Sequence, residues 1–200
     1  MAYNVHRIGD LGQLGECEPF FIDHYQWTKG KKPKAYGKMG LLEDYGLVVS
    51  MTAVERNPLR TYTEENTPVY KDSALEAFLN FPGVLGNQSY LNFEMNANGA
   101  LLSAFGTVKE RMFLRDFTRL QAVCEAKIEE DTWEILLKIP MELICSLFRT
   151  EPLQRGDSFT CNFYKICETP EYEHYGSFAP IISERPNFHL PEFFETAVIV

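Results

Sequence analysis

Polar side chains recur on one face of three segments whose residues alternate between apolar and polar. The segments are Asp72–Phe81, Tyr90–Asn96 and Ser158–Cys167. Because successive side chains of a strand point to opposite faces, the polar set of each segment lies together on one side of a sheet. These polar candidates are Glu76, Asn92, Glu94, Asn162 and Tyr164. Amides and carboxylates hydrogen-bond hydroxyl groups, and aromatic faces pack on apolar ring faces, so the pattern indicates a sugar site.

Glu76 and Glu94 also allow a second interpretation, the paired carboxylates of a glycoside hydrolase. That chemistry needs a separation of roughly 5 to 9 Å between the carboxyl groups and a raised pKa on one of them. Two glutamates on the solvated face of a sheet are the commoner arrangement. We therefore expect non-catalytic binding, and a small hydrolase that uses these two residues is the alternative.

The histidines do not form a metal-binding pattern. His174 and His189 are far apart in the sequence, and neither HxH nor HxxxH occurs. His174 stands beside Tyr175 and is a candidate for the sugar site, whereas His189 is expected to anchor the last loop by hydrogen bonds. No glycine-rich phosphate loop, GxSxG elbow or Cys–His nucleophile pattern is present.

Calcium is the one metal for which the sequence offers candidate ligands, because calcium favours clustered oxygen atoms. Such clusters occur at Glu64–Asn66 and at Glu129–Asp131, and the Asp72-Ser73 pair starts a predicted strand. A solvated turn or a local hydrogen bond to the backbone explains each of them as well or better. Calcium is therefore kept as an open expectation, and no other cofactor is expected.

Glycine and proline divide the chain into many short segments, which is typical of an all-β protein. Ten strands are predicted, at Phe20–Gln26, Lys38–Glu43, Gly46–Glu55, Asp72–Phe81, Tyr90–Asn96, Leu101–Phe105, Ala122–Ile128, Trp133–Ile139, Ser158–Cys167 and Phe193–Val200. One short helix is predicted at Met141–Phe148, where Pro140 precedes an apolar stripe. The predicted fold is a single domain over residues 1–200, an antiparallel β-sandwich of immunoglobulin or jelly-roll type. Trp133 alternates with Ile135 and Leu137 and is expected in its core.

Charge and cysteine content narrow the function classes. With 28 acidic residues against 19 lysines and arginines, the net charge is −9, which argues against a nucleic-acid partner. No apolar run is long enough to cross a membrane, and the first residues lack the basic-then-apolar pattern of a signal peptide. Five cysteines without a CxxC pair favour reduced thiols and a cytoplasmic location, or secretion if a leader has been removed.

Residues 72–79, which read DSALEAFL, resemble the Asp-Ser-x-x-Glu-x-Phe strand of the family 9 carbohydrate-binding modules. Further stretches resemble stand-alone bacterial proteins of this kind: ERNP from Glu55, YLNFEMN from Tyr90, NFYK from Asn162, HYGSF from His174 and FHLPEFF from Phe188. They occur in order from about residue 17 to the C-terminus. The resemblance implies a β-sandwich that binds sugar without cutting it. In the founding members the reducing end of a glycan lies between two aromatic side chains.

The resemblance also implies roles for individual residues. Glu76 falls on a ligand-contacting glutamate, and Asn92 lies near a position where the founding members use a basic residue. Tyr70 is near the first aromatic platform, and Tyr175 or Phe178 supplies the second. The founding members use tryptophan at both platforms, and this chain has none there. These modules are usually appended to secreted plant-polysaccharide hydrolases, which implies a link to polysaccharide breakdown, and some carry structural calcium.

The sequence therefore predicts a protein that binds a mono- or oligosaccharide, without nucleic-acid or membrane partners, and its oligomeric state is left open. Beside the small hydrolase, two more functions are compatible with the sequence. The first is that of an intracellular interaction domain that has lost sugar binding. The second is that of a haem-binding variant of the same sandwich, which would need an axial histidine or methionine facing a pocket.

Overall fold

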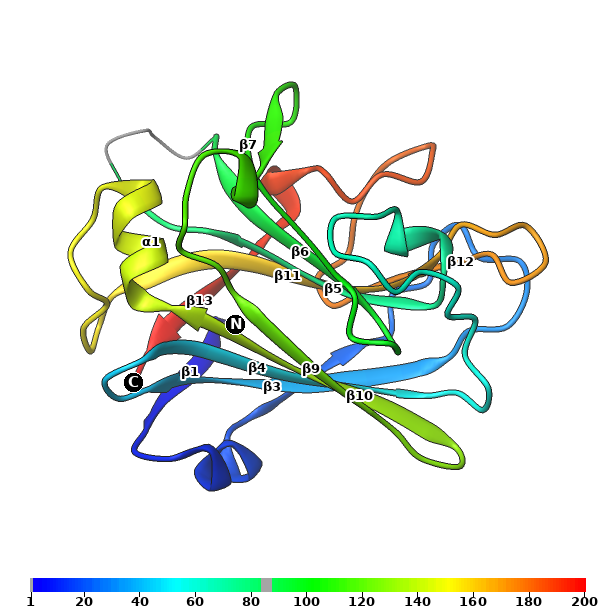
Figure 1. The fold of residues 1–200 in the computed structure, drawn as a ribbon, viewed down its shortest axis with the longest axis horizontal. Coiled ribbons are helices and arrows are strands. Elements are labelled where there is room, and N and C mark those ends of the chain that lie inside the picture. Colours follow the sequence, from blue (N-terminus) through cyan, green and yellow to red (C-terminus); the bar gives the residue numbers. More distant parts are fainter. Residues whose placement is uncertain (1, 84–87) are drawn as a thin grey trace.

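The computed structural model describes residues 2–83 and 88–200. The described residues form an all-β fold with one short helix (Figure 1). Its strands are β1 (Tyr3–Ile8), β2 (Pro19–Ile22), β3 (Lys34–Leu42), β4 (Gly46–Val54), β5 (Ala74–Asn80), β6 (Tyr90–Asn96), β7 (Leu101–Gly106), β8 (Arg111–Phe113), β9 (Val123–Ile128), β10 (Thr132–Pro140), β11 (Ser158–Cys167), β12 (His174–Ser177) and β13 (Glu195–Ile199). Each of the ten predicted strands overlaps one of these, and the all-β prediction is confirmed.

The strands form one curled sheet in the order β8-β7-β6-β5-β11-β13-β1-β3-β4-β10-β9, with β12 beside β11 and β2 beside β3. We call the strands from β8 to β13, with β12, the upper half, and those from β3 to β9, with β2, the lower half (Figure 1). Strand β1 joins them: Tyr3–Val5 pairs with β13, and His6–Ile8 pairs with β3.

Both pairings of β1 are parallel, so the prediction of a purely antiparallel sheet is wrong at this strand. The error has a simple source, because β1 is not among the strands that the sequence predicts. Its sequence, YNVHRI, has three polar residues among six and reads as a polar terminus. Strands β8 and β12 are also absent from the prediction, since they have three and four residues and depend on pairing with longer neighbours.

The main hydrophobic core lies between the two halves. The upper half contributes side chains such as Leu75, Phe93 and Phe163, and the lower half contributes Met39 and Ile135. The ring of Phe20 on β2 stacks on Phe163 of β11 with 3.8 Å between centroids, which joins the halves directly. Trp133 is fully buried in this core, as predicted. The apolar face of each alternating strand therefore packs inward, and the polar face of the upper half is turned away from the core.

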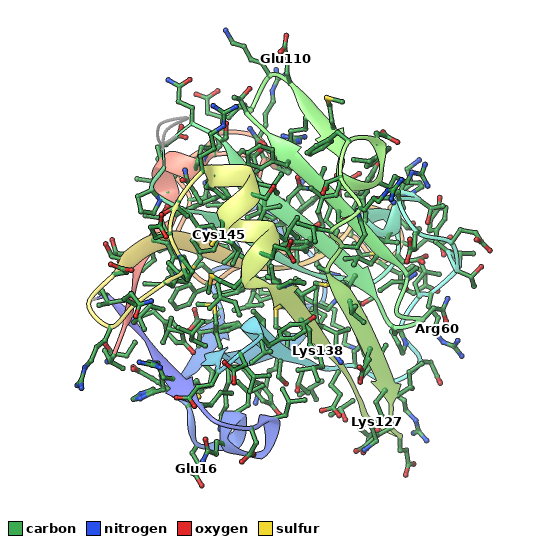
Figure 2. The ribbon with its side chains drawn as sticks, turned by 60° about the vertical axis from the view of Figure 1, so that its left-hand side comes forward. Glu16, Arg60, Glu110, Lys127, Lys138 and Cys145 are labelled. Atoms are coloured by element: carbon green, nitrogen blue, oxygen red, sulfur yellow. The ribbon has the colours of Figure 1, made fainter. Side chains whose placement is uncertain are left out.

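Helix α1 spans Met141–Phe148, as the sequence predicted. Its buried residues are Leu143, Ile144, Leu147 and Phe148, and Arg149 ends it in a left-handed conformation. Cys145 on this helix lies at the edge of the fold that faces the reader in Figure 2. Within the part of the chain that the structure describes, no helix has the length and apolar character needed to cross a membrane.

Candidate functional site

A cavity of about 700 Å³ opens on the outer face of the upper half, over β5, β6 and β7. Strand β8 and the segment from Pro186 to His189 form part of its wall. Tyr70, from the short 3-10 helix Val69–Lys71, and Tyr175, from β12, also line it. The floor consists of alternating strand residues that point away from the main core, so the strand period of two places polar side chains here.

Two glutamates and an asparagine form the polar floor of the cavity. Glu76 on β5 lies directly opposite Glu94 on β6 in the antiparallel register. The two are 2% and 4% exposed, so both carboxyl groups are almost removed from solvent. Asn92 donates from Nδ2 to Oε1 of Glu94 at 3.0 Å. Asn92 Oδ1 and Glu94 Oε2 are buried without a hydrogen-bond partner among the described residues, which leaves two acceptors for a ligand.

Burial disfavours the ionised form of both glutamates. Burial raises the pKa of Glu94 to about 7, although the Asn92 hydrogen bond and the charge of Arg111 oppose the shift. Burial, and then the negative charges of Glu94 and Glu168, raise the pKa of Glu76 well above its ordinary value. At neutral pH the pair therefore retains at least one proton and can both donate and accept a hydrogen bond.

A chain of hydrogen bonds holds the positive group at the cavity wall. Arg111 on β8 donates from Nη1 to the hydroxyl of Tyr90 at 2.6 Å, and this hydroxyl lies 2.9 Å from Nδ1 of His189. Because arginine can only donate, the Tyr90 hydroxyl gives its proton to His189, which accepts. Burial, with the charge of Arg111, lowers the pKa of His189 to about 3, so this ring is neutral.

Aromatic side chains enclose the cavity. Tyr175 donates its hydroxyl proton to Glu173 at 2.9 Å, and its ring meets Trp27 edge-on with 6.1 Å between centroids. Phe188 stacks on the buried Tyr164 at 4.1 Å. Trp27 thus supports the wall from behind, and Tyr175 presents a fixed ring beside the polar floor.

Beneath β12 lies a group that we call the buried ion cluster: Glu55, Ser73, Trp133, Lys165 and His174. Lys165 Nζ lies 2.6 Å from Ser73 Oγ, 2.8 Å from His174 Nε2 and 3.5 Å from Glu55 Oε2. Trp133 also donates from its indole N–H to Glu55 at 3.2 Å. His174 is next to Tyr175 in the chain, so the cluster fixes the strand that carries the cavity tyrosine.

The cluster contains one positive and one negative group. Burial lowers the pKa of Lys165, and Glu55 partly offsets this. Burial opposes ionisation of Glu55, but the charge of Lys165 and the hydrogen bonds from Ser73 and Trp133 outweigh it and lower the pKa of Glu55. Burial and then Lys165 lower the pKa of His174 to about 3, so His174 is neutral and accepts from the lysine.

The amino-acid sequence matches the family described as carbohydrate-binding family 9 over residues 21–199. The chain belongs to carbohydrate-binding family 9. A comparison with curated proteins gave no match.

Solved structures show the same fold for this family 9 chain. A candidate carbohydrate-binding protein from Bacteroides uniformis is similar with a TM-score of 0.82 and 22% identity, covering 100% of this chain and 99% of that one. A family 9 module from Caldicellulosiruptor kristjanssonii in complex with glucose is similar with a TM-score of 0.71 and 14% sequence identity. The match covers 100% of this chain and 96% of that one. The structure of a family 9 module from the same organism in complex with cellotriose also has a TM-score of 0.71 and 14% sequence identity, and the match covers 100% of this chain and 93% of that one. At this identity the likeness establishes the fold alone.

In this family 9 domain the cavity brings together five of the residues predicted from the sequence: Tyr70, Glu76, Asn92, Glu94 and Tyr175. Between the two residues considered for the second aromatic position, the structure places Tyr175 on the cavity wall. Phe178 packs instead against the main core, where its ring lies 5.9 Å from Phe163 and 5.7 Å from Phe20.

The other predicted residues lie away from the cavity lining. The Asn162 side chain accepts from the backbone N–H of Ala179 at 2.9 Å and donates to the Ala179 carbonyl at 3.2 Å, so it ties β11 to the segment after β12. Tyr164 is buried beneath Phe188. His174 belongs to the buried ion cluster. These polar groups are satisfied by the protein itself, and they support the wall rather than form it.

Sequence reasoning missed several residues of the cavity. Arg111 lies on the short strand β8, and Glu168 follows β11. Phe188 and His189 reach the cavity from a segment without regular structure, and only the tertiary fold brings them there. The FHLPEFF motif marks this segment, but it predicts only an anchoring role for His189. The residue does anchor through Tyr90, and it also lines the cavity.

Several of the acidic residues considered for calcium have other partners. At the tip of the β9–β10 hairpin, Glu130 pairs with Arg56 at 3.1 Å and Glu129 with Lys127 at 2.6 Å. The Asp72 carboxylate accepts from the backbone N–H of Tyr62 and from Asn96 Nδ2. Among residues 2–83 and 88–200, no group of three or more His, Cys, Asp or Glu side chains is placed to hold a metal ion. Calcium binding therefore stays a prediction.

Proposed function

We propose that this family 9 domain is a β-sandwich that binds a mono- or oligosaccharide in the cavity over β5 and β6 without cleaving it, in the service of polysaccharide breakdown. The observation that carries the proposal is the pair of unpartnered acceptors, Asn92 Oδ1 and Glu94 Oε2, on a buried polar floor beside tyrosine rings. The solved family 9 module in complex with glucose and with cellotriose supports the same ligand class.

The chemistry of the floor suits a ring that carries several hydroxyl groups. Hydroxyls donate to Asn92 Oδ1 and Glu94 Oε2, and Arg111 supplies positive charge at the wall. Tyr70 and Tyr175 offer faces for the apolar side of a sugar ring. Tyrosine is smaller than tryptophan, so we expect modest affinity.

Titration calorimetry with glucose, cellobiose, xylose and xylobiose tests this function. We expect binding by the wild type, and a loss of roughly tenfold in affinity for Tyr175→Ala because a stacking face is removed. Glu76→Ala should lose roughly 5- to 100-fold, since it removes a hydrogen-bonding group from the buried floor and leaves its ligand partner unpaired.

Tyr36→Ala is the matched control, because Tyr36 is exposed on β3 in the lower half. It should leave affinity unchanged. No detectable binding of any of these sugars by a folded protein would contradict the proposal. Equal losses in Tyr36→Ala and Tyr175→Ala would show that the cavity is not the site.

Hydrolysis is the second candidate, because a glycosidase also uses two facing carboxyl groups, one of them with a raised pKa. The discriminating measurement is turnover of chromogenic β-glucosides and β-xylosides. We expect none above background. Turnover that both Glu76→Gln and Glu94→Gln abolish would replace binding with catalysis as the function.

A further inference from the structure

Acidic side chains outnumber basic side chains in the lining of the cavity. Its lining contains four acidic side chains and one basic side chain, together with a neutral histidine: Glu76, Glu94, Asp116, Glu168, Arg111 and His189. The guanidinium of Arg111 is already engaged with Tyr90 at 2.6 Å. Asp116 and Glu168 lie at the exposed rim, whereas Glu76 and Glu94 lie on the buried floor, where charge interactions are stronger than in water.

The unsatisfied atoms indicate what the ligand must supply. Asn92 Oδ1 and Glu94 Oε2 are both acceptors, and the amide group of Asn92 donates to Glu94 Oε1. Both residues are more than nine-tenths buried. A ligand that satisfies them must donate. A protonated amine supplies three N–H donors on one atom, and its hydrogen bonds to carboxylates are stronger than those of a neutral hydroxyl.

The aromatic wall is compatible with a cation. Tyr70 and Tyr175 line the cavity beside the carboxylates, and the face of a tyrosine ring attracts an ammonium group. A metal ion is a weaker explanation for the negative charge, because the described residues gather no set of three acidic, histidine or cysteine ligands.

We propose that the cavity prefers a sugar that carries a free, protonated amine over the corresponding neutral sugar. This inference rests on the proposed function and adds the ligand class: an amino sugar such as a glucosamine unit, as found in de-N-acetylated glycans. The amine lies against Glu94 and Asn92, and the sugar ring lies beside the tyrosines.

Calorimetry at pH 6.0, where the amine of glucosamine is protonated, and at low ionic strength with glucosamine, glucose and N-acetylglucosamine tests the preference. We expect glucosamine to bind about tenfold more tightly than the two neutral sugars, because charge-assisted hydrogen bonds replace neutral ones. Glucosamine binding should also release protons, measured as a dependence of the heat on the ionisation enthalpy of the buffer, since a cation displaces a proton held by the Glu76–Glu94 pair. Glucose should release none.

Glu94→Gln should weaken glucosamine binding more than glucose binding, so that the two sugars bind about equally. Glu134→Gln, an exposed residue of β10 in the lower half, makes the same charge change away from the cavity and should retain the preference. Glucose binding equal to or tighter than glucosamine binding would overturn this inference and leave the proposed function intact. Loss of the preference in Glu134→Gln would overturn it as well, because the effect would then be one of overall charge. No binding of any of the three sugars by a folded protein would remove the proposed function itself.

Discussion

Replacing Lys165 with methionine is expected to destabilise the protein by about 3–5 kcal/mol, because it leaves the Glu55 carboxylate buried without its counter-charge. Lys165 is fully buried and is the positive member of the buried ion cluster. Methionine keeps much of the length of the side chain, so the loss reports the charge rather than a cavity. Urea unfolding of the wild type and Lys165→Met, followed by circular dichroism, measures the difference in the free energy of unfolding.

The double variant Glu55→Gln/Lys165→Met separates a lost charge pair from lost packing. With both charges removed, no ion of this pair is left unpaired, and we expect much of the stability to return. This comparison remains informative if the single variant does not fold. A loss below about 1 kcal/mol in Lys165→Met, or no recovery in the double variant, would show that the pair does not stabilise the fold in this way.

Glu94 is expected to contribute stability that falls as the pH rises from about 5 to 8, while the buried, neutral His174 and His189 contribute in the opposite direction up to about pH 6.5. Burial raises the pKa of Glu94 to about 7 in the folded protein, against an ordinary value of 4.5. Between these values the folded state binds a proton that the unfolded state has lost. The stabilisation is complete below the lower pKa and is lost as the pH rises through the upper one. The shift corresponds to about 3 kcal/mol, and Glu76, whose pKa is also raised, acts in the same direction.

Glu94→Gln removes this titration without a large change of shape. From pH 5 to pH 8 the urea midpoint of Glu94→Gln should rise more, or fall less, than that of the wild type. Glu134→Gln, which changes an exposed glutamate of β10, should keep the dependence of the wild type. An identical pH dependence in the wild type and Glu94→Gln would contradict the assignment of a protonated Glu94 in the folded state.

Local alternation is sufficient to predict the polar floor. The strands that carry this floor alternate its polar residues, Glu76, Asn92 and Glu94, with large apolar residues. These apolar residues, such as Leu75 and Phe93, identify the face that packs on the core. Tyr70 and Tyr175 came from the family resemblance, since neither alternation nor spacing marks them.

The remaining cavity residues could not be predicted because their position depends on tertiary structure. Arg111 lies on a strand of three residues, and His189 lies on a segment fixed by hydrogen bonds to distant residues. Lys165, beneath the cavity, does carry a signal in the sequence. Lys165 lies on the same face of β11 as Cys161 and Phe163. It therefore faces the core, where a lysine needs a buried partner.

Strand β1 places the first and last strands of the described fold side by side, with Tyr3 opposite Ala197. Among the described strands, β1 is the one that pairs with a strand of each half. During synthesis the upper and lower halves can begin to form separately, but the sheet cannot be completed until β13 has left the ribosome. Contacts of such large sequence separation form slowly, so the partly folded chain exposes the unpaired edges of β11 and β1 for that interval. A nascent chain in which β13 has not yet emerged is therefore the form of this protein most exposed to aggregation.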